Sequence, residues 1–287
     1  MTEQDAFVRE WTRWHEGHES RRADPHGFLA ATGLYWLSGQ AVGIPRLPGR
    51  WRTDEDGPVV DLGDGEHLDI DGRTVTGRYA FGPIPERGGV TVGFDGGVIE
   101  VARRGGRDIL RPRRPDFPFL SRYTGTPTYA AEPRWRVPAR FVAYVAPRSH
   151  EVGAAVDGLT HVYESPGYLE FEVDGQVHRL IAFPGHRPRD LLVLFTDATS
   201  GVTTYAANRS VSIPVPDAEG RTVIDFTRAT NLPCAYTDFA TCPLPPAENR
   251  LPFAVEAGEK IPRERVAGVP TEAGIVPATA ETGILAR

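Results

Sequence analysis

Residues 168–183 read YLEFEVDGQVHRLIAF, and this stretch decides the fold class. In its first half, apolar residues alternate with Glu170 and Glu172, as in a strand with one buried and one solvated face. Asp174-Gly175 then separates this run from a second apolar run, and both residues of an Asp-Gly pair adopt positive φ readily. The stretch therefore predicts an antiparallel β-hairpin.

The same Asp-Gly turn signal recurs along the chain. Further Asp-Gly pairs stand at 56–57, 64–65, 71–72, 95–96 and 157–158. Strands are predicted near 58–62, 66–70, 73–80, 90–94, 97–103, 107–111, 136–146, 176–183, 190–196, 202–206, 209–214 and 221–227. No helical pattern of ten or more residues interrupts them, which disfavours a parallel βαβ fold. We expect a mainly β protein, an antiparallel β-sandwich or barrel.

The rest of the chain divides around these strands. Residues 1–49 should form a helical segment, with a helix from residue 3 to about 20 and a short second helix opening at Asp24-Pro25. Residues 50–111 are expected to form a small antiparallel β unit, and 112–134 a proline-rich connection. Residues 135–260 should form a larger barrel or sandwich, and the last residues, 261–287, a flexible tail.

Composition and charge limit the classes of function. The 287 residues are 40% hydrophobic and carry a net charge of −6, which disfavours a nucleic-acid groove. No run of about 20 apolar residues and no basic N-terminal region followed by an apolar one is present, so we expect a cytoplasmic protein without a membrane partner. Lys260 is the only lysine among 32 basic residues. Arginine grips carboxylate and phosphate groups in a two-pronged fork, so a small-molecule ligand is the expected partner. The oligomeric state stays open.

Residues 225–260 read DFTRATNLPCAYTDFATCPLPPAENRLPFAVEAGEK, and we call them the lid. Both cysteines lie here, and the many prolines favour neither helix nor strand. Such a segment needs side chains to satisfy its backbone groups, and Asp225, Asn231 and Asn249 suit that work. We expect a packed cover over one end of the β domain.

The lid resembles the pattern of a bacterial domain-of-unknown-function family, number 1684, close to D-F-N-R-x-x-N-x-P-C-A-F/Y-x-x-x-A-T-C-P-L-P-P-x-E-N-R-L and then E-A-G-E-K. Supporting stretches lie at 33–37, 104–107, 165–167 and 197–201, with Tyr205 and Arg209, so the resemblance spans roughly residues 8–260. The chain departs from the pattern at Thr227, Thr230 and Leu232. The resemblance implies a β-rich fold and a shared site, without an established activity.

Cys234 and Cys242 allow several interpretations. Buried structural thiols, a redox pair, a nucleophile and metal ligands all remain open. A structural zinc is disfavoured because zinc-binding cysteines usually stand two to four residues apart. No cofactor is predicted. A single metal ion would have to use His161, His178 or Asp225 in addition, and the histidines of 15–18 stand at the spacing of a metal-binding tract or of a solvated helix face.

Polar residues that face the mouth of the β domain make up the candidate site. Serine-hydrolase and phosphate-loop motifs are missing from the sequence. Asp225 and Tyr205 are candidates for proton transfer and Cys234 for a nucleophile. The candidate ligand-binding residues are Arg107, Asp197, Arg209, Arg228, Asn231, Cys242, Asn249 and Arg250. The alternative for the charged residues is a buried network that only stabilises the fold.

Two classes of function therefore compete, with a third behind them. The first is a cytoplasmic protein that binds an anionic or polar metabolite under the lid, with acid–base catalysis as a further option. The second is a non-catalytic binding or scaffold protein whose lid is structural. The third is a cysteine- or metal-dependent enzyme that uses Cys234 and Cys242.

Overall fold

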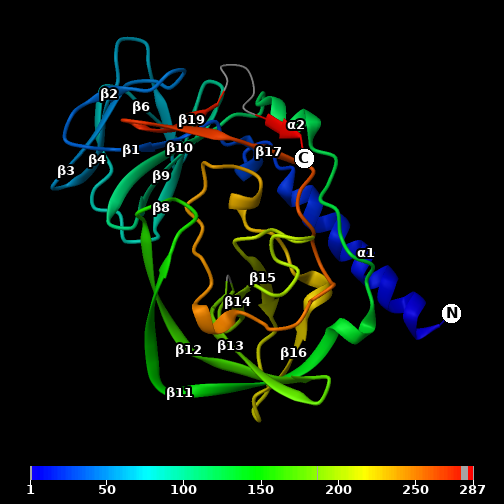
Figure 1. Cartoon of the computed structure of the whole chain (residues 1–287). Coiled ribbons are helices and arrows are strands. Elements are labelled where there is room, and N and C mark those ends of the chain that lie inside the picture. Colours follow the sequence, from blue (N-terminus) through cyan, green and yellow to red (C-terminus); the bar gives the residue numbers. More distant parts are fainter. Residues whose placement is uncertain (1, 186, 279–283, 287) are drawn as a thin grey trace.

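The computed structural model describes residues 2–185, 187–278 and 284–286 (Figure 1). Helix α1 spans Glu3–Arg22, close to the predicted helix, and begins with a capping box between Thr2 and Asp5. The second predicted helix does not form as an α-helix. The Asp24 carboxylate instead accepts the N–H of His26 in a turn, and only the 3₁₀ helix η1, Phe28–Ala30, follows.

The N-terminal half of the chain supplies most of the strands of two antiparallel sheets. The larger has the strand order β18-β19-β1-β10-β9-β8-β5-β6. Its strands are β1 Leu34–Trp36, β5 Leu68–Ile70, β6 Arg73–Val75, β8 Gly89–Phe94, β9 Gly97–Arg104, β10 Arg107–Arg113, β18 Gly268–Thr271 and β19 Gly274–Pro277. The smaller sheet has the order β2-β3-β4-β7, with bounds Val42–Gly43, Arg50–Asp54, Gly57–Asp61 and Arg78–Ala80. Both contribute to one hydrophobic core around the fully buried Trp51.

A third sheet forms a half-barrel from the second half of the chain, in the order β15-β14-β13-β12-β11-β16. Its strands are β11 Arg136–Gly153, β12 Thr160–Val173, β13 Gln176–Pro184, β14 Leu191–Phe195, β15 Arg209–Ile213 and β16 Arg221–Asp225. The predicted hairpin at 168–183 is confirmed, because Val173 pairs with Gln176 across the turn. The two turn residues, Asp174 and Gly175, have φ of 50° and 75°, as a two-residue hairpin turn requires. The mainly β, antiparallel fold is therefore confirmed.

Three segments differ from the predictions. Residues 202–206 form turns, because backbone N–H groups around them bond back to Thr199 rather than to a neighbouring strand. The connection 112–134 contains the short helix α2, Pro118–Arg122, and the start of η2, Pro133–Trp135. The expected tail instead contains strands, namely β17 Glu264–Val266, β18, β19 and β20 Ile284–Ala286. The strand β19 forms because β1 has a free edge with which it pairs, Leu34 opposite Ile275.

The lid lies between the two β units (Figure 1). It contains η3 Phe226–Arg228, η4 Pro233–Ala235 and η5 Ala247–Asn249, with irregular backbone between them. Its first part packs Tyr236 and Phe239 into a core shared with Leu34 and Ile109 of the large sheet, and its later part packs Leu251 and Val255 into the half-barrel core. Within the described ranges, no helix is both long and apolar enough to span a bilayer.

Candidate functional site

Asn249 fixes the lid to the half-barrel. It is fully buried where β13 and β14 separate, and its Oδ1 accepts the N–H of Ile181 at 2.7 Å. Its Nδ2 donates to the carbonyls of Ile181 at 2.9 Å and Leu194 at 2.8 Å. All three hydrogen bonds serve backbone groups of β13 and β14 at positions where these two strands do not pair with each other. The structure thus gives this predicted ligand-binding residue a stabilising role.

Asp197 and Arg209 form a buried ion pair inside the half-barrel. Arg209 Nη2 lies 2.7 Å from Asp197 Oδ2, and each side chain is 1% exposed. The guanidinium also donates to the carbonyls of Ala257 and of Val255, the latter at 3.0 Å. Burial lowers the pKa of Arg209, and the Asp197 carboxylate opposes this effect. The pair holds the later part of the lid against β15. This is the alternative of a buried network that stabilises the fold.

The other three predicted arginines lie in separate places. Arg107 is exposed at the start of β10 and stacks over the Trp36 ring at 4.5 Å. Arg228 bonds Glu10 of helix α1 at 2.6 Å and lies 3.3 Å from Asp225. Arg250 is exposed at the far end of the lid. The structure therefore does not bring the predicted arginines together around one ligand.

The proposed proton-transfer residues are also engaged. Asp225 accepts the N–H of Thr227 at 3.2 Å and also its hydroxyl group, which caps η3. Tyr205 donates its hydroxyl to the carbonyl of Cys234 at 2.8 Å. Burial raises the pKa of Tyr205 to about 12, so its hydroxyl keeps its proton at neutral pH. Asp225 thus stabilises the lid at Thr227, and Tyr205 stabilises it at Cys234.

A crevice lies where the lid meets the large sheet, and we call it the Arg111 crevice. Its volume is about 190 Å³. One wall comes from β9, β10 and the residues before β1, and the other from the first part of the lid. It is lined by Phe28, Ala31, Glu100, Arg111, Arg113, Pro233, Thr237, Phe239, Ala240, Thr241 and Cys242. Of all the predicted site residues, only Cys242 reaches it.

The pairing of β9 with β10 positions the charged groups of this crevice. The Gly105-Gly106 turn joins β9 to β10, both glycines having positive φ, and the register of this hairpin sets Glu100 opposite Arg111. Arg111 Nη1 donates to the Glu100 carboxylate at 2.8 Å, and Nε donates to the carbonyl of Phe239 at 2.7 Å. Alternation along β10 turns Arg113 to the same side, where it also binds Glu100.

Positive charge exceeds negative charge around the Arg111 crevice. Glu100 is shared by Arg111, Arg113 and Arg104, the last at 2.9 Å. Burial alone would raise the pKa of Glu100, but the three guanidinium groups outweigh burial and hold that pKa below its ordinary value. Burial, with the nearby Arg111 charge, also lowers the pKa of Arg104. The carboxylate therefore stays ionised. Glu86 also acts on Arg104, which does not line the crevice, so Glu100 faces two lining cations, Arg111 and Arg113.

Some donors on the crevice wall have no acceptor. An arginine has five N–H donors. Within the described part of the chain, Arg111 uses three of its five and Arg113 uses two, and Arg113 Nε is buried without a partner. Thr237 and Thr241 lie on the opposite wall, which the lid forms. The crevice is thus suited to a molecule that carries negative charge and several acceptor oxygens.

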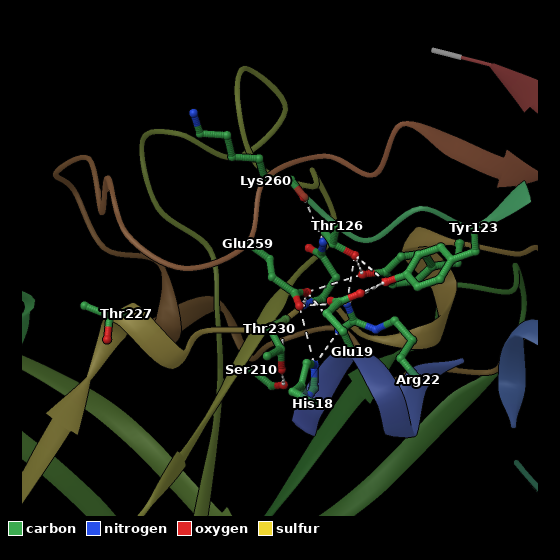
Figure 2. A network of polar contacts seen from close by, with 12 residues as sticks. His18, Glu19, Arg22, Tyr123, Thr126, Ser210, Thr227, Thr230, Glu259 and Lys260 are labelled. Atoms are coloured by element: carbon green, nitrogen blue, oxygen red, sulfur yellow. Dashed lines mark hydrogen bonds and ion pairs between the residues drawn. The ribbon is translucent and has the colours of Figure 1, made fainter. Parts of the chain in front are cut away.

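A second polar assembly, the Glu259 cluster, connects helix α1 to the end of the lid (Figure 2). The Glu259 carboxylate, 2% exposed, lies 2.7 Å from Arg22 Nη1 and 3.4 Å from His18 Nε2. It also accepts the N–H of Asn231 at 2.7 Å, and the Asn231 amide donates to the carbonyl of Lys260 at 2.8 Å. The remaining members are Glu19, Tyr123, Thr126 and Tyr236.

The Glu259 cluster explains the histidines near the start of the chain. His15 stacks on Trp11 with ring centroids 4.8 Å apart, and His18 stacks on Trp14 at 5.4 Å. Nowhere in the described ranges do three or more His, Cys, Asp or Glu residues gather as a metal site would require. His18 contacts Glu259 outside helix α1, whereas His15 stacks on tryptophans of its own helix, and Trp11 donates its indole N–H to the carbonyl of Thr227 at 2.8 Å.

Sequence reasoning missed both polar assemblies, for different reasons. Glu100 and Arg111 could have been paired by counting outward from the Gly105-Gly106 turn, since a two-residue turn fixes the register. The Glu259 cluster offered no such signal. Arg22 is 237 residues from Glu259 and ends a polar helix, so nothing local predicts its burial.

Comparisons with known proteins agree with the resemblance drawn from the lid. The family described as "Protein of unknown function (DUF1684)" matches residues 121–260, a shorter stretch than the expected 8–260. The solution NMR structure of an uncharacterized protein from Haloarcula marismortui shares 32% identity, covering 50% of this chain and 80% of that one, with a TM-score of 0.42. Proteins of curated function give no match. The bacterial character of the family stays an expectation.

Proposed function

Because the chain belongs to the DUF1684 family, which is described only as of unknown function, we propose a function from the site itself: the protein is a cytoplasmic binder of a small anionic metabolite in the Arg111 crevice. The observation that carries this proposal is the sharing of one ionised carboxylate, Glu100, by the two arginines that line the crevice, Arg111 and Arg113. Uncompensated buried charge is costly, and an anion would supply the missing counter-charge.

The size and chemistry of the crevice narrow the ligand class. Its volume of about 190 Å³ lies below the roughly 300–1,000 Å³ of pockets for drug-sized ligands, which favours a molecule of few heavy atoms. Arginine forks match carboxylate and phosphate oxygens. A small carboxylate or a phosphorylated fragment therefore fits best. Two free thiols suit a reducing compartment such as the cytoplasm.

The crevice favours binding over proton transfer. Glu100 is held in its ionised form, and Cys242, the other titratable group that is not an arginine, has a pKa well above its ordinary value because it donates to Cys234 and is buried. Neither group changes protonation near neutral pH, as a general acid or base would. Asp225 and Tyr205 do not line the crevice.

Thermal unfolding with inorganic phosphate or malonate as probes tests the proposal. At a concentration 100 times its dissociation constant, a ligand adds about 2.7 kcal/mol of stability, so the melting temperature should rise by several degrees. The Arg113→Met variant should bind about 10- to 100-fold more weakly, because a charge-assisted hydrogen bond contributes about 1.5–3 kcal/mol.

Arg107→Met is the matched control, since Arg107 is on the same strand but faces the Trp36 ring. It should respond to the probes like the unchanged protein. An equal rise with chloride at the same ionic strength, or an unchanged response in Arg113→Met, would contradict the proposal. An equal loss of response in Arg107→Met would move the site to the start of β10.

A further inference from the structure

Cys234 and Cys242 lie side by side although eight residues separate them. Both are buried and free, and the N–H of Cys234 donates to the Sγ of Cys242 at 3.4 Å. Since the N–Cα bond is about 1.46 Å long, the Cys242 sulfur lies no more than about 4.9 Å from the Cα of Cys234. This places the second sulfur within reach of the first side chain, as a disulfide requires.

The two thiols differ in their electrostatic surroundings. The Cys242 thiol donates to the Cys234 sulfur and so lowers the pKa of Cys234, against the effect of burial, and the Arg265 guanidinium adds to this lowering. Arg265 Nη2 lies 3.4 Å from the carbonyl of Cys234. The pKa of Cys242 is correspondingly raised. One thiol with a lowered pKa beside one with a raised pKa is typical of reactive cysteine pairs rather than of two inert buried ones.

Cys242 is one of the residues that line the Arg111 crevice, and Cys234 lies beside it. A crevice of about 190 Å³ admits a molecule as small as hydrogen peroxide. Such an oxidant would reach the sulfur pair through this opening.

We infer that Cys234 and Cys242 form a redox pair, which a small peroxide entering through the Arg111 crevice converts to a disulfide and which dithiols restore. The Cys234 sulfur, whose pKa is the lowered one, attacks one peroxide oxygen, the O–O bond breaks, and the departing hydroxide leaves as water with the thiol proton. The Cys234 sulfur is then a sulfenic acid. The Cys242 sulfur attacks it, the S–S bond forms, the S–O bond breaks, and a second water leaves with the Cys242 proton. The two thiols lose two electrons, and the peroxide gains them.

A disulfide in a cytoplasmic protein is usually transient and redox-sensing. The inference does not depend on the anion proposal, because it needs only the position of the two sulfurs and an opening to Cys242. Peroxide chemistry at this pair and phosphate binding by Arg113 can therefore fail separately.

Mass spectrometry of the intact protein tests the redox pair. The folded protein is treated with hydrogen peroxide, unfolded, and labelled with N-ethylmaleimide. We expect the loss of two hydrogen atoms, about 2 Da, with no label added, and two labels after treatment with dithiothreitol. Peptide mapping separates this change from oxidation of Met1.

Cys242→Ser is the variant that distinguishes a pair from two independent thiols. Without its partner, Cys234 should stop at the sulfenic or sulfinic acid, and the loss of 2 Da should disappear. If the protein that was treated with peroxide while folded still takes up two labels after unfolding, the inference is overturned. Oxygen addition at both cysteines without a disulfide would also overturn it.

Discussion

Replacement of Asp197 by asparagine should destabilise the protein by about 3–5 kcal/mol, because it leaves the Arg209 guanidinium charged inside the half-barrel without its counter-ion. Arginine does not lose its proton in proteins, so a change of protonation cannot relieve this cost. Asparagine retains the size of the side chain, and the loss therefore reports charge rather than a cavity. Urea denaturation, followed by the fluorescence of the five tryptophans, measures it.

A matched change of an exposed carboxylate serves as the control. Glu170 pairs with Arg179 on the outer face of the same sheet, and Glu170→Gln should leave the urea midpoint where it is. In a second variant, Asp197→Leu with Arg209→Met replaces the ion pair by apolar side chains and should recover part of the stability. If Asp197→Asn lowers stability no more than Glu170→Gln does, the pair is not what holds the lid to β15.

Replacement of Arg22 by methionine should also cost about 3–5 kcal/mol at pH 7, because Glu259 then keeps a buried negative charge with only His18 beside it. In the unchanged protein, burial would raise the pKa of Glu259, but His18, Arg22 and the Asn231 N–H together lower it. The stability that this carboxylate contributes is therefore present above its unfolded pKa and is lost as the pH falls through the folded pKa.

The Arg22→Met variant should show the opposite dependence on pH. Without Arg22, burial dominates and the folded pKa of Glu259 rises above its unfolded value. The variant then gains stability relative to the unchanged protein as the pH falls from 7 toward 5, where Glu259 takes up a proton. Glu19, Tyr123 and Tyr236 face the same site, and of these Tyr123 and Tyr236 have raised pKa values, so they stay protonated over this range.

Arg21→Met provides the control for this pH experiment. Arg21 is the neighbouring residue on helix α1 and is exposed. Its replacement should alter neither the urea midpoint at pH 7 nor the pH dependence. A difference between Arg22→Met and the unchanged protein that stays constant from pH 7 to 5 would show that removing Arg22 does not raise the folded pKa of Glu259.

The fold was predictable where its information is local. A strand, a two-residue turn and the next strand follow one another in the sequence, so the 168–183 hairpin could be predicted from alternation and one Asp-Gly pair. The pairing of β1 with β19 could not, because Leu34 and Ile275 are 241 residues apart and each strand is too short to show a period. Tertiary packing, not local pattern, orders the segment that composition alone describes as a tail.

The candidate site shows the same division. The residue types were predictable, since two arginines and one lid cysteine line the Arg111 crevice. The particular arginines were not predictable. The predicted Arg209, Arg228 and Arg250 lie in or near the lid in sequence, whereas Arg111 and Arg113 come from a strand of the large sheet. A residue such as Asn249 has the same sequence appearance whether it binds a ligand or two strands. Only its three bonds to backbone groups distinguish these roles.

The position of β19 has a consequence for how the chain is made. In the large sheet β19 lies between β18 and β1, so the earliest strand of that sheet to be synthesised pairs with the latest. Until residues 274–277 leave the ribosome, the backbone of residues 34–36 has β10 on one side and an unpaired edge on the other. Unpaired edges recruit other chains. The nascent protein therefore keeps an aggregation-prone edge until residues 274–277 have been made, and a chain terminated before residue 274 would keep that edge open.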